Sequence, residues 1–193
     1  MRLCIDPGHG GKFNNAVGNG LVEKDVVLTY AGHLRSQLEH LGHDVIMTRD
    51  ADVELADDLN QDLIARVRIA NDWGADAFVS LHCNGFTDPS ANGFEVFTSP
   101  GQTNSDRLAD EILESVGTAF PLVKMRRDFS DGDGDQEAKF VVLVKTKMPA
   151  VLIELGFLTN LNDATRIKSA VAMADFTLAT TDAIETYRRE WLA

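Results

Sequence analysis

The sequence predicts an α/β fold whose β-sheet is largely parallel and covered by helices on both faces. Short apolar runs alternate along the chain with segments of helical periodicity, which is typical of this class. Several of these runs are almost wholly apolar, as strands buried on both faces are. A chain of 193 residues, 44% of them hydrophobic and 25% charged, is long enough to bury such a core.

Six runs are expected to be strands, and the last of them shows the pattern most clearly because residues 151–153 are all aliphatic. The expected strands are Leu3 to Asp6, Asp44 to Thr48, Ala77 to His82, Phe94 to Thr98, Phe140 to Val144 and Ala150 to Leu155. In a sheet of this kind, ligands bind at the carboxyl ends of the strands. The ends of these runs are therefore where a site is expected.

Four segments carry apolar residues at helical spacing between or after the strands. The stripes run from Val27 to Leu41, from Leu59 to Trp73, from Leu108 to Val116 and, as one long last helix, from Ile167 to Ile184. Gly42 and Gly74 follow the first two stripes in the position of helix stops. Since the chain contains neither a repeat nor a Pro/Ser-rich linker, residues 1–193 are expected to form one domain.

Composition excludes several classes of function. The formal net charge of −12 argues against binding to nucleic acid, whose phosphates favour clustered Lys and Arg. No apolar run approaches bilayer length, so no membrane insertion is expected, and the N-terminus lacks the apolar region of a secretory signal. Cys4 and Cys83 lie in apolar strand-like runs and are expected to be free thiols.

Three of the expected strands end at or just before polar residues, which a buried sheet would otherwise avoid. His9 lies in the glycine-rich turn after the first strand, His82 ends the third and Glu154 ends the last. An ionised Glu154 after an apolar run is costly unless it is paired or near a metal. Glu23 completes the group at the start of the first helix.

Two histidines and one carboxylate would leave the fourth position of a tetrahedral zinc site open, as catalytic zinc sites do. A second carboxylate, not bound to zinc, is then needed to take a proton from water and pass it to the leaving nitrogen. Spacing alone leaves open which of Glu23 and Glu154 is the ligand.

Each of these residues also has an ordinary structural interpretation. His9 beside glycine is typical of a turn, His82 of a core histidine, and Glu23 of a helix N-terminus. Glu154 is the hardest to explain structurally, because its neighbours require burial. The coincidence of all four residues at one end of one sheet favours a metal site.

Two other patterns are interpreted as not functional. Residues 131–135 read Asp-Gly-Asp-Gly-Asp and look like a calcium loop, but the glycine position and the final Glu position of the EF-hand pattern are not met. They are expected to form a flexible acidic loop. His33, His40 and His43 lie on or just after the first helix, away from the strand ends, and are expected at the surface.

Taken in order, the motifs of this chain resemble the zinc-dependent N-acetylmuramoyl-L-alanine amidases of the Amidase_3 type. The resemblance runs nearly the whole length, and although each motif alone is weak, their order is specific. The motifs are residues 5–11 (IDPGHGG), 23–25 (EKD), 48–50 (TRD), Arg66 with 69–71 (IAN), 80–84 (SLHCN), 93–96 (GFEV) and 148–160 (MPAVLIELGFLTN).

The resemblance implies roles that spacing left open. It implies one zinc ion per chain held by His9, Glu23 and His82, with Glu154 as general base and acid. It implies a twisted, mostly parallel sheet of about six strands. The implied substrate is the amide between N-acetylmuramic acid and L-alanine in peptidoglycan, so that the enzyme degrades the cell wall. Asn84, just beyond a ligand, is a candidate for orienting substrate or for closing a turn.

Arg66 and Asn71 are expected to serve the fold, and Asp6 is a candidate acceptor for the second N–H of His9. The chain lacks the plug-like insert of cell-separation members, and it has no wall-binding repeat. It therefore resembles a phage endolysin made in the host cytoplasm without a signal peptide; the alternative is an extracytoplasmic domain of a longer protein. The oligomeric state stays open.

Three rival functions are weighed against this expectation. A zinc peptidase that cleaves within the stem peptide would use the same site chemistry. A silent glycan-binding module would be expected to lack the base or a ligand, whereas all four residues are present here. Metal storage fits poorly, because an open His/His/Glu site is a weak buffer.

Overall fold

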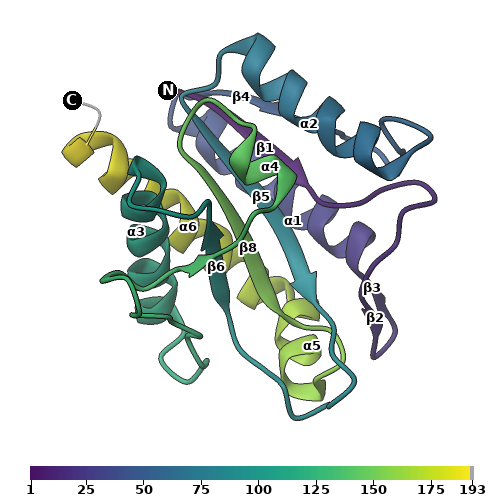
Figure 1. The fold of residues 1–193 in the computed structure, drawn as a ribbon. Helices are drawn as coiled ribbons and strands as arrows, with labels where there is room; N and C mark the ends of the chain where they lie inside the picture. The colour runs from purple at the N-terminus through teal and green to yellow at the C-terminus, as the bar shows by residue number, and fades with distance from the viewer. Residues whose placement is uncertain (192–193) are drawn as a thin grey trace.

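A computed structural model describes residues 1–191 of the 193-residue chain. Its centre is a six-stranded sheet in the order β4-β1-β5-β8-β6-β7 (Figure 1). The strands are β1 (Arg2–Pro7), β4 (Asp44–Met47), β5 (Ala77–Asn84), β6 (Glu95–Thr98), β7 (Gln136–Glu137) and β8 (Ala150–Phe157). The first four in sheet order are parallel, β6 runs antiparallel to β8, and β7 runs parallel to β6. The expected α/β fold with a mostly parallel sheet is confirmed.

Helices cover both faces of the sheet, each over its own apolar cluster. One face packs against α1 (Glu23–His40), α3 (Asn104–Ala119) and α6 (Ala170–Trp191), and α5 (Leu161–Lys168) joins the same cluster through Ile167. The other face packs against α2 (Leu59–Trp73) and α4 (Val141–Val144). A small hairpin of β2 (Val17–Gly18) and β3 (Leu21–Val22) leads into α1.

The helix ends follow from local chemistry. Asp58 caps α2 by accepting a hydrogen bond from the backbone N–H of Gln61, and Gly74 ends this helix in the left-handed conformation. Thr103 and Asp106 form a reciprocal capping box at the start of α3. Gly42 likewise follows α1 with a positive φ of 85°. These stops confirm the glycine boundaries expected from the sequence.

The expected strand from Phe140 to Val144 is wrong. Residues Val141–Val144 form the short helix α4, and the sixth strand is the pair Gln136–Glu137 beside β6. A run of four or five apolar residues is too short for periodicity to separate helix from strand. Here the helical turn directs Val142 and Leu143 into the cluster that covers the α2 face of the sheet.

The prediction of a single long last helix is also wrong, because Ser169 separates α5 from α6. Ser169 is extended (ψ 122°) at the end of α5, and its hydroxyl accepts a hydrogen bond from the N–H of Ala172 at the start of α6. The break rotates the second helix, so Val171 and Leu178 of the expected stripe lie exposed. The buried face of α6 keeps Ile184 of that stripe and is otherwise lined by Phe176, Ala179, Ala183 and Tyr187.

Three further expectations have definite outcomes. His33 and His40 are exposed as expected, but His43 is buried, and its Nε2 lies 2.7 Å from Glu185 Oε1 on α6. Cys4 and Cys83 are buried free thiols in different core clusters on opposite faces of the sheet, so they are not placed to bridge. Within residues 1–191, no helix combines the length and the apolar character needed to span a bilayer.

Candidate active site

The carboxyl ends of three adjacent strands bring the expected site residues together. His9 lies on the loop after β1, His82 near the end of β5 and Glu154 near the end of β8. His82 and Glu154 are register partners across the β5–β8 pair, so their side chains leave the sheet on the same face. Glu23, the first residue of α1, reaches the same point from the helix.

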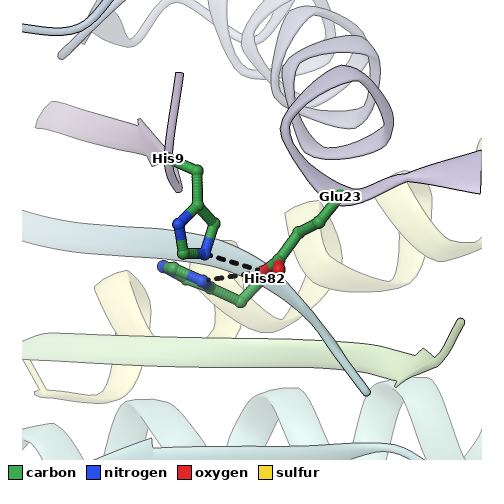
Figure 2. A group of neighbouring side chains, drawn as sticks. All are labelled: His9, Glu23 and His82. Carbon is green, nitrogen blue, oxygen red and sulfur yellow. Dashed lines mark hydrogen bonds and ion pairs between the residues drawn. The ribbon is translucent and has the colours of Figure 1, made fainter. Parts of the chain in front are cut away.

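His9 and His82 converge on the carboxylate of Glu23 (Figure 2). Glu23 Oε1 lies 3.1 Å from His9 Nε2 and 3.0 Å from His82 Nδ1. The two imidazole rings are nearly perpendicular, with their centroids 4.9 Å apart. One ligand atom from each of the three residues lies within 4.8 Å of the others, so the group could hold a metal ion.

The chemistry of the three donors fits a zinc ion. His9 Nε2 is buried and has no hydrogen bond of good geometry in the described chain, although Glu23 lies close to it. Burial alone raises the pKa of Glu23, but the hydrogen bond with His82 and the contact with His9 outweigh it and hold the pKa well below its usual value. An ionised carboxylate between two imidazoles is a ready ligand set with room for one more ligand.

The backbone around His9 and His82 leaves space for the rings to approach. A Cβ at Gly8 would come within 2.3 Å of the imidazole of His82, so this ring needs a glycine beside it. His9 itself has a φ of 60°, a left-handed conformation that is uncommon for a residue with a side chain. Such a conformation persists only when surrounding contacts hold it.

Two buried arginines supply those contacts. Arg66 donates to the backbone oxygens of Pro7 (2.8 Å) and His9 (2.5 Å) from α2. Arg49 donates to the oxygens of Pro7 (2.9 Å) and Gly8 (2.8 Å) from the segment after β4. The loop that carries His9 is therefore clamped from two directions, and the expected structural role of Arg66 is confirmed.

Asp6 completes this clamp and does not contact His9. One of its oxygens accepts hydrogen bonds from Thr48 (2.5 Å) and Arg66 (2.8 Å), and the other accepts from Ser80 (2.7 Å). Burial alone would raise the pKa of Asp6, but the charge of Arg66 and the two hydroxyl groups lower it below its usual value. The suggested pairing of Asp6 with the imidazole of His9 is therefore not what the structure shows.

Glu154 differs from Glu23 and Asp6 because no Lys, Arg or His side chain within residues 1–191 forms an ion pair with it. Its Oε2 is buried and makes no hydrogen bond within residues 1–191. Burial is the main reason why its pKa is raised well above the usual value, and the negative charges of Glu23 and Glu95 raise it further. A raised pKa of this kind is common among carboxyl groups that take up and release protons in active sites.

The cleft above these residues has a volume of about 360 Å³ and an apolar wall. His9, His82 and Glu154 all open into it. The sequence patterns did not indicate the wall residues, which come from the loop after β1, from α2 and from the segment that leads into α4. They are Phe13, Asn15, Leu59, Leu63, Lys139 and Phe140. Only tertiary structure brings these segments together.

Asn84 and Asn71 have fixed partners. The amide of Asn84 donates to Glu95 Oε1 (2.6 Å), and the other oxygen of Glu95 accepts from Arg126 (2.8 Å). Asn71 bridges α2 to the segment after α4 through Lys145 and Lys147, a structural role as expected. The contact of Asn84 with substrate stays a prediction.

Comparison with known proteins identifies a family for the whole domain. Residues 3–186 match the Amidase_3 family, described as N-acetylmuramoyl-L-alanine amidase. The chain is 38% identical over 177 residues to the amidase CwlM of Bacillus licheniformis, covering 88% of this chain and 62% of that protein. It is 35% identical over 189 residues to LytC of Bacillus subtilis, covering 97% of this chain and 35% of that protein. The chain thus spans less than two thirds of the length of these relatives.

Solved structures agree on the fold. The amidase AmiC2 of Nostoc punctiforme superposes with a TM-score of 0.85 at 33% identity over 98% of both chains. An N-acetylmuramoyl-L-alanine amidase of Clostridium difficile superposes with a TM-score of 0.88 at 27% identity, covering 98% of this chain and 97% of that one. The similarity therefore extends over the sheet and its helices.

Proposed function

The chain belongs to the Amidase_3 family of N-acetylmuramoyl-L-alanine amidases, and we propose that it hydrolyses the amide between N-acetylmuramic acid and L-alanine in peptidoglycan. The observation that carries the proposal is the convergence of His9, Glu23 and His82 at the base of a cleft into which His9, His82 and Glu154 open. Three potential ligands and one carboxyl group with a raised pKa are the parts that metal-assisted amide hydrolysis requires.

We propose that one zinc ion per chain is held by His9, Glu23 and His82. Bound zinc would supply a Lewis acid that polarises the amide carbonyl and lowers the pKa of the attacking water. The ionised Glu23 lies between the two imidazoles and would offset the positive charge of the ion. Arg66 and Arg49 hold the loop of His9, so this ligand is positioned before any ion binds.

Glu154 is proposed as the proton carrier. It lies on the same rung of the sheet as His82, one strand away, and opens into the same cleft. Its carboxylate takes a proton from the attacking water and donates this proton to the nitrogen of L-alanine as the amide bond breaks. The apolar wall formed by Phe13 and Phe140 keeps competing water away from these steps.

The place of action follows from the substrate and is the bacterial cell wall. A role in phage lysis, with synthesis in the host cytoplasm, stays a prediction of the sequence analysis. Cleavage within the stem peptide is the rival activity, because the same four residues would serve it. The two activities differ only in which amide reaches the site.

Mass spectrometry of muropeptides after digestion of purified peptidoglycan separates these functions. The amidase is expected to release stem peptides with a free amino group on L-alanine and to leave glycan chains with intact lactyl groups. Cleavage between amino acids would indicate the peptidase, and undigested peptidoglycan would indicate a binding module.

The zinc proposal has its own measurement. The purified protein should contain about one zinc per chain, lose activity on chelation and regain it when zinc is added back, because an open site with three protein ligands exchanges its metal. Full activity in metal-stripped protein would overturn the proposal.

A further inference from the structure

A second hollow, of about 650 Å³, shares Lys139 with the cleft and lies along the other side of α4. Val141 and Val142 of this helix line the cleft, whereas Leu143 and Val144 line the second hollow. We call this hollow the lysine groove, and it is lined by residues 99–100, 103–105, 139, 143–144 and 146–149. Because the cleft and the groove meet at Lys139, one elongated ligand can occupy both.

The lysine groove is positively charged in an acidic chain. Three of the seven lysines of the sequence, Lys139, Lys145 and Lys147, lie within nine residues of one another. Residues 138–153 contain no Asp or Glu, although the whole chain carries 30 of them. Lys139 and Lys147 line the groove, and none of the described residues that line it is acidic. The charge of the groove therefore favours an anionic ligand.

Neither of these two lysines is neutralised by the protein itself. Among the ion pairs of residues 1–191, Lys12 and Lys24 have aspartate partners, whereas Lys139 and Lys147 take part in none. Both of the latter are exposed. Glu137, the acid closest in sequence to Lys139, accepts a hydrogen bond from a backbone N–H in the turn after β6 (2.5 Å). The two ammonium groups are therefore available to a ligand.

The backbone that carries the two lysines is held in place. Both neighbours of Lys139 contact β6: the N–H of Ala138 donates to a backbone oxygen of this strand (3.0 Å), and the ring of Phe140 packs against an aromatic ring of the strand with centroids 5.3 Å apart. The N–H of Lys147 donates to the side chain of Asn71 on α2 (2.9 Å). The positions from which the two side chains extend are therefore fixed by the fold.

The proposed substrate supplies anions at a matching place. The stem peptide of peptidoglycan starts at the L-alanine whose amide is cleaved, and its second residue is a D-glutamate linked through the side chain. The α-carboxyl group of this D-glutamate is therefore either a free carboxylate or a carboxamide. An extended peptide spans about 3.3–3.6 Å per residue, so this group lies close to the reacting amide. Lys139 lines the same cleft as His82 and Glu154.

We propose that the stem peptide leaves the cleft past Lys139 and continues into the lysine groove. Lys139 binds the α-carboxylate of the second residue, and Lys147 binds a carboxylate further along the peptide. The inference rests on the proposed amidase function and adds a substrate preference to it, for stem peptides whose second residue is not amidated. Lys139 is then a specificity-determining residue that takes no part in moving the proton.

Hydrolysis of two matched disaccharide tripeptides by the zinc-loaded enzyme tests the proposal. The two substrates differ only in whether the α-carboxyl group of D-glutamate is free or amidated, and kcat/KM is measured from the peptide released. The wild type should prefer the free carboxylate by about fivefold, the scale of an exposed ion pair. Lys139→Gln should abolish the preference by lowering kcat/KM for the acidic substrate alone, and Lys139→Glu should reverse it.

The matched control is Lys145→Gln, which removes the same charge from the same segment at an exposed residue that lines neither the cleft nor the groove. This variant should keep the wild-type preference. Lys147→Gln should also keep it, but should reduce the gain in kcat/KM that follows when the stem peptide is lengthened from two residues to five. An unchanged gain in Lys147→Gln would overturn the path through the groove.

Three other outcomes would overturn the inference. Equal kcat/KM of the wild type for both substrates would remove the preference while leaving the amidase function intact. Equal loss on both substrates in Lys139→Gln would show that this residue supports the fold or the reaction and not recognition. Equal reduction of the preference by Lys139→Gln and Lys145→Gln would show that net charge alone attracts the substrate. If the wild type releases peptide from neither substrate nor from peptidoglycan, the proposed function itself fails.

Discussion

Beneath the cleft, Asp6 and Asp62 are buried on two sides of Arg66, whereas in the edge loop (residues 128–135) the buried Asp135 lies against the partly buried Asp133. In the first region the arginine outweighs the cost of burial, and the pKa of Asp6 falls below its usual value. In the second region no side-chain cation of the described chain reaches the pair, and the pKa of Asp135 rises to about 8. Burial alone therefore does not determine whether an acidic side chain is charged.

The cleft contains both situations within one site. Glu23 lies between two imidazoles, and its pKa is lowered. The pKa of Glu154 is raised, first by burial and then by the negative charges of Glu23 and Glu95. This contrast supports the assignment of Glu23 as a ligand and of Glu154 as the proton carrier, which spacing in the sequence could not distinguish.

The largest expected effect comes from substituting Glu154 and Glu23 in separate variants. Glu154→Gln should fold and keep zinc but lose hydrolysis by at least about a hundredfold, the usual scale for a general base. Glu23→Ala should instead lose zinc, because it removes one of three protein ligands. Metal content and the rate of peptidoglycan hydrolysis, measured on both variants in parallel, check the comparison.

Either of two outcomes would contradict these roles of Glu154 and Glu23. Loss of zinc from Glu154→Gln with retention by Glu23→Ala would mean that the roles are exchanged. Near-normal turnover of Glu154→Gln would mean that another group moves the proton.

The next effect concerns the buried arginine of the clamp. Arg66→Leu should lower the free energy of unfolding by about 3–5 kcal/mol, because it leaves Asp6 and Asp62 buried without their cation. The control is Arg35→Leu, which removes an exposed pair with Glu39 at the same spacing and should cost about 0.3–0.5 kcal/mol. Urea unfolding of both variants measures the difference, and equal losses would show that burial of the pair is unimportant.

A smaller, pH-dependent effect is expected at Asp6. The lowered pKa of Asp6 contributes stability that is present above its usual value of 3.8 and is lost as pH falls through the lower folded-state value. Asp6→Asn should therefore cost about 1.5–3 kcal/mol at neutral pH, and the difference from wild type should shrink below about pH 4. Urea unfolding over a series of pH values tests this, and a difference that stays constant down to pH 3 contradicts it.

Much of the architecture follows from local patterns. The apolar runs ending in His82 and Glu154 are strands of the sheet, and the stops at Gly42 and Gly74 follow helices. The patterns failed where one local signal fitted two structures. Residues 141–144 are apolar enough to form either a strand or a helix. The choice of a helix depends on tertiary packing, because these residues cover the face of the sheet that also packs against α2. The break at Ser169 depends on a serine that favours capping over helix continuation.

The candidate site was predictable only in part, because its support is long-range. His9, Glu23, His82 and Glu154 were found from residue type and position at strand or helix ends. The clamp on His9 joins residues 57 positions apart through Arg66 and the backbone oxygen of His9, and no periodicity indicates such a partner. The burial of Asp135 under the edge loop depends likewise on Thr98, 37 positions away.

One rung of the sheet carries His82, Glu154 and Glu95 side by side on β5, β8 and β6. Backbone hydrogen bonds set the spacing of adjacent strands at about 4.8 Å, so the main chain determines how far apart His82 and Glu154 lie. The positions of His9 and Glu23 depend instead on the loop between β1 and α1. Under the proposed roles, sequence changes in that loop would therefore alter the affinity for metal, while the main chain would keep the distance between the ligand His82 and the proton carrier Glu154. Metal affinity and the placement of the proton carrier would then be able to evolve separately.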